Sequence, residues 1–223
     1  SAPKVASSPS GDTGALRVYL VDRPGAVQTV IRFAAPAPGI AGDDRPALAV
    51  LNTILGGTFT SRLNQNLRED HGYTYGAGSS FSQFIHGGVF QARSAVKADV
   101  TGPALGEFLK EFSRLRGGPL SATFIKAPSG DLTDGELTKA RESIRTDLIQ
   151  ALQGHAGPMN IAADLLPAGL PLDTTSKDLA AISGLKTADL NLKAHDAINL
   201  ERGVLVLVGD KALILDQIKE FNL

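Results

Sequence analysis

The sequence contains no cysteine and no tryptophan, and its only methionine is Met159. The lack of cysteine excludes disulfides, thiolate zinc sites and cysteine nucleophiles, and it is compatible with oxidising and reducing compartments alike. No apolar run approaches the roughly 18 residues that a membrane-spanning helix needs. No charge of one sign dominates, because 22 Lys and Arg stand against 23 Asp and Glu. We therefore expect no nucleic-acid partner, no membrane span and no pull toward an anionic membrane surface.

The length of 223 residues is enough to bury a core, and 43% hydrophobic residues are ordinary for a globular protein. Residues 1–14 are rich in Ser, Pro, Gly and Ala and are predicted to be a flexible linker or entry. Residues 15–223 show no clear boundary and are predicted to form a single domain. Because the chain begins with Ser1, we expect that a leader was removed or that it is a piece of a larger protein.

The order of predicted elements indicates an α+β fold with one mainly antiparallel sheet covered by helices. Turn residues separate runs of apolar and β-branched residues, and Ala35 to Asp44 is predicted to be a loop. Strands are predicted at 16–21, 27–33, 73–84, 89–96 and 204–208. Helices are predicted at 45–55, 61–69, 101–115, 133–152, 158–166, 174–182, 187–198 and 211–221. Thr101 and Asp210 are expected to cap helices, and Thr133 and Glu136 fit a capping box.

The most informative stretch is residues 55–76, LGGTFTSRLNQNLREDHGYTYG, which we call the signature segment. Gly56 and Gly57 end one helix and allow close approach of another chain. In the helix that follows, Leu63 and Leu67 are one turn apart and are expected to face the core. Arg62, Asn66 and Glu69 are then expected on the opposite side of that helix.

Two side chains of the signature segment suit peptide chemistry. Arg68 lies near the helix end, and Tyr73 and Tyr75 have the same parity in the next strand, which predicts a shared face. A guanidinium and a phenol are good donors to a substrate carbonyl or a developing oxyanion. The alternative is that Arg68 pairs with Glu69 or Asp70 while the tyrosines pack on helices.

The signature segment resembles that of the M16 family of zinc metallopeptidases, the pitrilysin or mitochondrial processing peptidase-like family. The match lies in the Gly-Gly loop, Ser61-Arg62-Leu63, Leu67-Arg68-Glu69 and the Gly-Tyr and Tyr-Gly pairs. It extends more loosely from about Val18 to the C-terminus. The resemblance implies a LuxS/MPP-like metallohydrolase fold. It also implies that Arg68 and Tyr75 serve catalysis, with Tyr73, Gly56 and Gly57 as substrate-binding candidates.

The zinc motif of that family, His-x-x-Glu-His, is missing. The corresponding helix, Arg45 to Asn52, offers no imidazole and no carboxylate, and His71, His86, His155 and His195 lack ligand spacing. We therefore predict no metal site and no cofactor in this chain, with His71 at most lining a cleft. The resemblance implies a non-metal half, with zinc in a partner half that is fused N-terminally or separate, a peptide substrate, and a periplasmic location as in bacterial relatives.

A rival reading from a different class is a structural or peptide-binding subunit without peptidase activity, since the family's fold also occurs in core subunits of respiratory complexes. An independent enzyme conflicts with the missing ligands. The sequence has neither a Gly-x-Ser-x-Gly elbow nor a Walker loop. Asp131, Asp134 and Glu136 fit a helix start better than a catalytic carboxylate pair.

Overall fold

The computed structural model describes residues 16–118, 131–154 and 156–221. The linker predicted for residues 1–14 lies outside these ranges. Among the described helices, none combines the length and the apolar character that crossing a membrane requires.

The described strands form one five-stranded sheet in the order β1-β5-β2-β4-β3. Only β1 and β5 run parallel; β2 is antiparallel to β5 and β4, and β3 is antiparallel to β4, so the mainly antiparallel sheet is confirmed. The strand bounds are β1 Arg17–Asp22, β2 Gln28–Ala37, β3 Thr74–Phe84, β4 Gly87–Lys97 and β5 Val204–Gly209. The β3–β4 pair turns at His86, as its Gly-Gly signal predicts.

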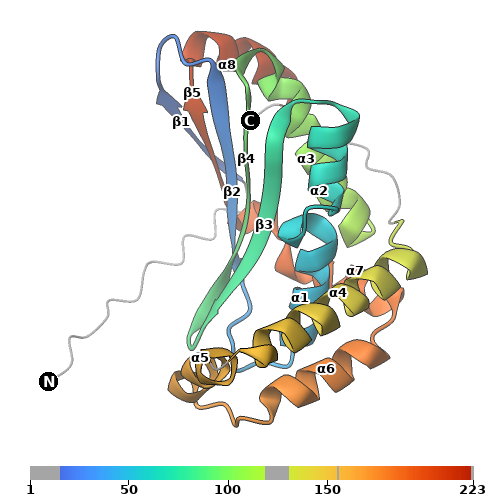
Figure 1. The fold of residues 1–223 in the computed structure, drawn as a ribbon. Coiled ribbons are helices and arrows are strands. Elements are labelled where there is room, and N and C mark those ends of the chain that lie inside the picture. Colours follow the sequence, from blue (N-terminus) through green and yellow to red (C-terminus); the bar gives the residue numbers. More distant parts are fainter. Residues whose placement is uncertain (1–15, 119–130, 155, 222–223) are drawn as a thin grey trace, which may run out of the picture.

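The described helices gather on one side of the sheet and leave the other side open (Figure 1). Together they complete the expected α+β layers. Their bounds are α1 Arg45–Asn52, α2 Arg62–Asn64, α3 Thr101–Arg116, α4 Asp134–Gln153, α5 Ala156–Leu165, α6 Thr174–Gly184, α7 Thr187–Ala197 and α8 Lys211–Ile218. The π-helical turns η1 Thr53–Gly57 and η2 Gln65–Asp70 continue α1 and α2.

The core lies between the sheet and these helices. In β2 the side chains of Thr29, Ile31 and Phe33 are buried while Val30 and Arg32 between them are exposed, the period-two pattern of a half-covered strand. The Phe33 and Phe112 rings meet edge to face with centroids 5.2 Å apart, and Phe112 also contacts Phe90 of β4. This aromatic contact fixes α3 against the centre of the sheet.

Local sequence rules predicted most boundaries. Thr133 and Glu136 form the expected capping box of α4, and the Asp210 side chain accepts a hydrogen bond from the Ala212 amide at the start of α8. Two expectations were wrong. The predicted loop at Ala35 begins later, because β2 pairs with β4 as far as Ala37. Thr101 is the first residue of α3 and not its cap, since its hydroxyl donates to the Ala98 carbonyl.

Candidate functional site

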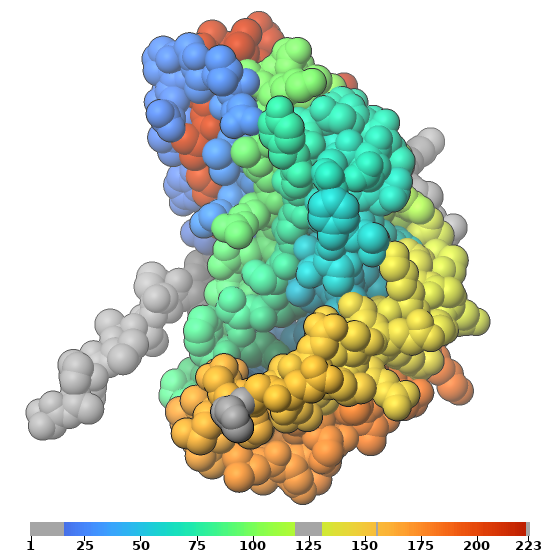
Figure 2. Space-filling model, viewed as in Figure 1, coloured from blue at the N-terminus to red at the C-terminus, as the bar shows by residue number. Residues whose placement is uncertain are grey.

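The signature segment folds as two short helical pieces joined to β3, and it lies on the surface beside α4 (Figure 2). Leu63 and Leu67 are fully buried, as their spacing predicts. The chain widens from α2 into the π-helical turn η2 at Gln65. Such turns are rare and often occur at functional sites. Arg68 lies within this turn, so the turn determines the direction in which its side chain projects.

Arg68 is held at the surface by two neighbours. Its guanidinium carbon lies 4.0 Å from the centre of the Phe59 ring, and its Nη1 lies 3.0 Å from Oε1 of Glu69. The pairing with Glu69 is therefore present, whereas Asp70 accepts a hydrogen bond from Gln65. The Glu69 carboxylate is half exposed, so this ion pair is weak and leaves the guanidinium able to bind another acceptor.

Tyr73 and Tyr75 have different surroundings despite their shared parity. Tyr73 precedes β3, packs against the core and stacks on His71, with ring centroids 4.9 Å apart. Tyr75 is 93% exposed. A register irregularity separates Thr74 from Ala77, and the Thr74 hydroxyl donates to the Ala95 carbonyl and accepts a hydrogen bond from the Gly76 amide. Such a bulge re-aims a side chain, and here it lies at the position of Tyr75.

Gly56 and Gly57 serve contacts within the chain. A Cβ on Gly56 would lie 2.3 Å from the Ser79 amide nitrogen of β3, and one on Gly57 would lie 2.7 Å from the Asn52 side-chain nitrogen. The close approach that these glycines allow is thus between η1 and β3, and between η1 and the end of α1. Their substrate-binding role stays a prediction.

Asn64 joins the signature helix to the edge of the sheet. Its Oδ1 accepts a hydrogen bond of 3.0 Å from the Ala77 amide, and its Nδ2 donates to the Thr58 carbonyl. A side-chain amide thus satisfies a backbone donor of β3 that faces away from β4. This contact ties the position of β3, and so of Tyr75, to the helix that carries Arg68.

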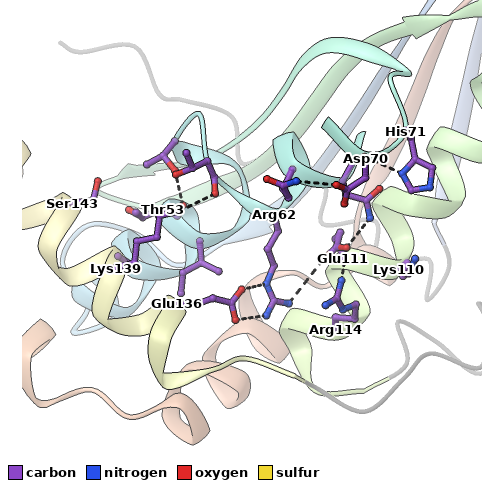
Figure 3. Close-up of a pocket in the computed structure, with 16 residues that line it drawn as sticks. Thr53, Arg62, Asp70, His71, Lys110, Glu111, Arg114, Glu136, Lys139 and Ser143 are labelled. Atoms are coloured by element: carbon purple, nitrogen blue, oxygen red, sulfur yellow. Dashed lines mark hydrogen bonds and ion pairs between the residues drawn. The ribbon is translucent and has the colours of Figure 1, made fainter. Parts of the chain in front are cut away.

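The signature helix also contributes to a partly buried ionic cluster, which the sequence did not predict. Arg62 and Asn66 were expected on the side away from the core, but the Arg62 side chain is only 9% exposed and Asn66 is buried. Arg62 donates to both carboxylate oxygens of Glu136, at 2.6 and 2.8 Å (Figure 3). Its Nη1 also lies 3.0 Å from Asp131. The Ser-Arg-Leu triplet gave no local sign of these partners, which come from α4 and the residues before it.

Glu111 of α3 forms the centre of this cluster and is nearly inaccessible. Its Oε1 accepts hydrogen bonds from Asn66 and Arg114, at 2.8 and 2.7 Å. Beside the cluster lies a cavity of ≈ 500 Å³ between the signature helix, α3 and α4. The cavity is lined by polar side chains of both charges, and His71 also lines it, with its Nδ1 2.9 Å from the Asn66 carbonyl.

The ionic cluster shifts its own titration. Burial alone raises the pKa of Glu136, but hydrogen bonds from Arg62 and Thr133 outweigh it and hold the pKa below its usual value. The pKa of Asp131 is lowered for the same reason, with Arg114 and Arg62 as the donors that overcome burial. These carboxylates are therefore committed to arginines, which suits a structural role better than acid–base catalysis.

The described residues contain no group of three or more His, Asp or Glu side chains placed to hold a metal ion. His86 lies at the β3–β4 turn and His195 is exposed on α7, while His155 lies outside the described ranges.

This chain is similar in sequence to one protein family and to several bacterial proteins. Residues 2–126 match the family model for the peptidase M16 inactive domain. An uncharacterized zinc protease of Mycobacterium tuberculosis is 31% identical over 148 residues, covering 66% of this chain and 31% of that protein. One from Bacillus subtilis is 26% identical over 155 residues, covering 70% of this chain and 32% of its own length. The chain thus spans about a third of the length of these curated relatives.

Solved structures share the fold. A protease from Helicobacter pylori superposes with a TM-score of 0.77 at 20% identity, over 88% of this chain and 45% of that one. A peptidase M16 inactive domain from Pseudomonas fluorescens gives 0.69 at 22% identity, over 88% and 44%. A chain of complex III2 from Candida albicans gives 0.68 at 16% identity, over 92% and 48%.

Proposed function

The chain belongs to the peptidase M16 inactive-domain family, and we propose that it is the non-metal half of an M16-type zinc peptidase. In this proposal it closes a cleft over a peptide whose hydrolysis takes place at the zinc of a partner half. Arg68 and Tyr75 supply hydrogen-bond donors to the bound peptide, and Tyr73, Gly56 and Gly57 shape the surface around them.

The exposure of Tyr75 together with the placement of Arg68 carries this proposal. An almost fully exposed phenol, next to a bulge held by Thr74, serves no packing role in this domain. Arg68 lies in η2, the helical turn that precedes β3, and its guanidinium is oriented by the Phe59 ring. A stacked guanidinium and an accessible phenol on consecutive elements suit a backbone carbonyl that gains negative charge during hydrolysis.

The described residues of this chain do not offer a metal-ligand set, so the zinc in the relatives' names is assigned to the partner half. When bound there, zinc would supply a Lewis acid and an activated water. The tasks left to this chain are to bind the peptide, to orient its carbonyl and to help exclude water from the cleft.

The test is cleavage of a quenched fluorescent oligopeptide by the native assembly that contains this chain, with and without a zinc chelator. We expect chelator-sensitive cleavage. Arg68→Ala and Tyr75→Phe should each lower kcat/KM by about a hundredfold to a thousandfold, the range for loss of one donor to a developing oxyanion, with unchanged zinc content. Arg145→Ala is the matched control for Arg68→Ala, because Arg145 is also an exposed arginine but lies on α4. Wild-type rates in both test variants would remove the assigned roles.

The second candidate is a structural or peptide-binding subunit. The likeness to a complex III2 chain favours it only at the level of fold. The discriminating observation is the sequence of the partner half, since a partner without His-x-x-Glu-His would make the assembly a scaffold. Absence of cleavage across several unrelated peptides would support this second candidate.

A further inference from the structure

The open face of the sheet has an unusual composition. In an antiparallel sheet with one solvated face, that face is normally polar. Here the outward positions of β1, β5 and β2 include Tyr19, Val21 and Val30, each at least 40% exposed, and β5 has valine at every outward position. Within the five described strands, leaving out the terminal residue of each, no outward-facing position is an Asp or a Glu.

Basic side chains complete this face. Arg32 of β2 and Arg93 of β4 are directly opposite each other in the register, and both are exposed. Lys97 lies further along β4, opposite Gln28. The side chains of these three residues have no hydrogen-bond or ion-pair partner among the described residues, and Lys97 bonds only through its backbone, to the Tyr73 carbonyl. Like charges directly opposite each other destabilise a sheet, so the Arg32–Arg93 pair is a cost to this domain alone.

The registers arrange these groups in one row. Tyr19, Val206, Arg32 and Arg93 are successive cross-strand neighbours from β1 through β5 and β2 to β4. Adjacent strands are roughly 4.8 Å apart, so the apolar and the cationic residues of this row lie within about 15 Å. Arg17, which is also outward and exposed, adds a further cation at the start of β1. A single helix or strand laid across the sheet can contact the whole row, with apolar side chains toward Tyr19 and Val206 and carboxylates toward Arg32 and Arg93.

We propose that the open face of the sheet docks an acidic, partly apolar segment of the partner half, with its carboxylates on Arg32 and Arg93. This inference rests on the proposed function for the existence of that half. The curated relatives extend for about two thirds of their length beyond the matched stretch, so they contain chain that could cover the face. A second copy of this face is a poor occupant, because it would bring its own arginine pair toward Arg32 and Arg93. Nucleic acid does not match the valine and tyrosine side chains.

Lys97 provides a direct test of the occupant. A carbodiimide joins a lysine amine to a carboxylate that lies against it, so we would treat the native assembly with it and identify the Lys97 cross-links by mass spectrometry. A cross-link from Lys97 to an Asp or Glu of the zinc-binding half supports the proposal. A cross-link to a second copy of this chain, or no cross-link at Lys97, overturns it.

Charge variants test the role of the arginines. Arg32→Glu places a carboxylate opposite Arg93, so the domain itself should lose no thermal stability, whereas docking should weaken. We expect a rise of about tenfold in the dissociation constant of the halves, or the equivalent loss of Lys97 cross-linking if they are fused. Arg145→Glu is the matched control, because Arg145 is exposed on α4 and away from this face.

The outcomes separate this inference from the function it rests on. Zinc content and peptide cleavage report the proposed function, while Lys97 cross-linking and salt-dependent association report the docking. An active zinc peptidase whose association is unaffected by Arg32→Glu and Arg93→Glu overturns the docking proposal alone. An assembly without a zinc-binding half overturns both.

Discussion

The guanidinium of Arg68 stacks over the ring of Phe59, with its central carbon 4.0 Å from the ring centre. Phe59 is 66% exposed, so the ring contributes little to the core. A cation over an aromatic face is attracted by the ring quadrupole, by about 0.5–1 kcal/mol at an exposed site. The contact restricts a long side chain before substrate arrives, which makes Phe59 a positioning residue for Arg68.

Replacement of Phe59 should therefore act through Arg68. We expect Phe59→Leu to lower kcat/KM for peptide cleavage by about threefold, the equivalent of that stacking energy, without a change in thermal stability. Phe59→Tyr retains an aromatic face and should stay near wild type. In the Arg68→Ala background Phe59→Leu should have no further effect; additive losses would contradict the positioning role.

Substitution of Gly56 should destabilise the domain. A Cβ at this buried position would lie 2.3 Å from the Ser79 amide nitrogen, so η1 or β3 must move. We expect Gly56→Ala to lower the free energy of unfolding by about 2–3 kcal/mol, as overpacking does. Gly184→Ala is the control, because nothing lies within 4 Å of a Cβ there. Equal urea midpoints for the two variants would refute the close approach.

Arg62 should matter for stability more than an ordinary surface arginine. Its loss removes the cation that pairs with the partly buried Glu136 at 2.6 Å and lies 4.0 Å from the buried Glu111, which keeps its hydrogen bonds from Asn66 and Arg114. Removing one partner of a buried ion pair costs about 3–5 kcal/mol, so we expect Arg62→Ala to fall near the lower end of that range. Arg145→Ala, on the exposed face of α4, should change the free energy of unfolding by less than about 0.5 kcal/mol. Denaturant unfolding followed by circular dichroism measures both.

The ionic cluster also predicts the direction of the acid response. The pKa of Glu136 and the pKa of Asp131 are lowered in the folded protein, so the unfolded chain binds more protons in acid. Their contribution to stability is complete above the ordinary pKa values of 4.5 and 3.8 and is lost as the pH falls through the lower folded values. The urea midpoint should fall below about pH 4.5. Glu136→Gln should flatten this dependence, whereas Glu142→Gln, exposed on α4, should retain it.

Local patterns predicted the elements because the forces that form them are local. Valines at alternate positions marked β5, the Thr133–Glu136 box marked the start of α4, and His86-Gly87-Gly88 marked the β3–β4 turn. Family resemblance, carried by the signature segment, predicted the M16 inactive domain that the family model confirms. The π-helical turns were not predicted, because the spacing of apolar residues in η1 and η2 is equally compatible with an ordinary α-helix.

The partners of the signature helix could not be predicted in the same way. Arg62 reaches Glu136 across 74 positions, and Asn66 reaches Glu111 across 45. Helical spacing shows which side chains share a face but not which other helix covers that face. A polar helix face is therefore predicted to be exposed to solvent, although another helix with complementary charges can cover it.

The sequence by itself determined the order of strands and helices, the buried Leu63 and Leu67, and the family to which the chain belongs. Only the tertiary structure decided that the Arg62 side chain is largely covered while Tyr75 is exposed, and that Arg32 and Arg93 are neighbours on an open face. The physical reason is that periodicity and capping act over a few residues. Ion pairs, close glycine contacts and strand register form only when distant segments pack together.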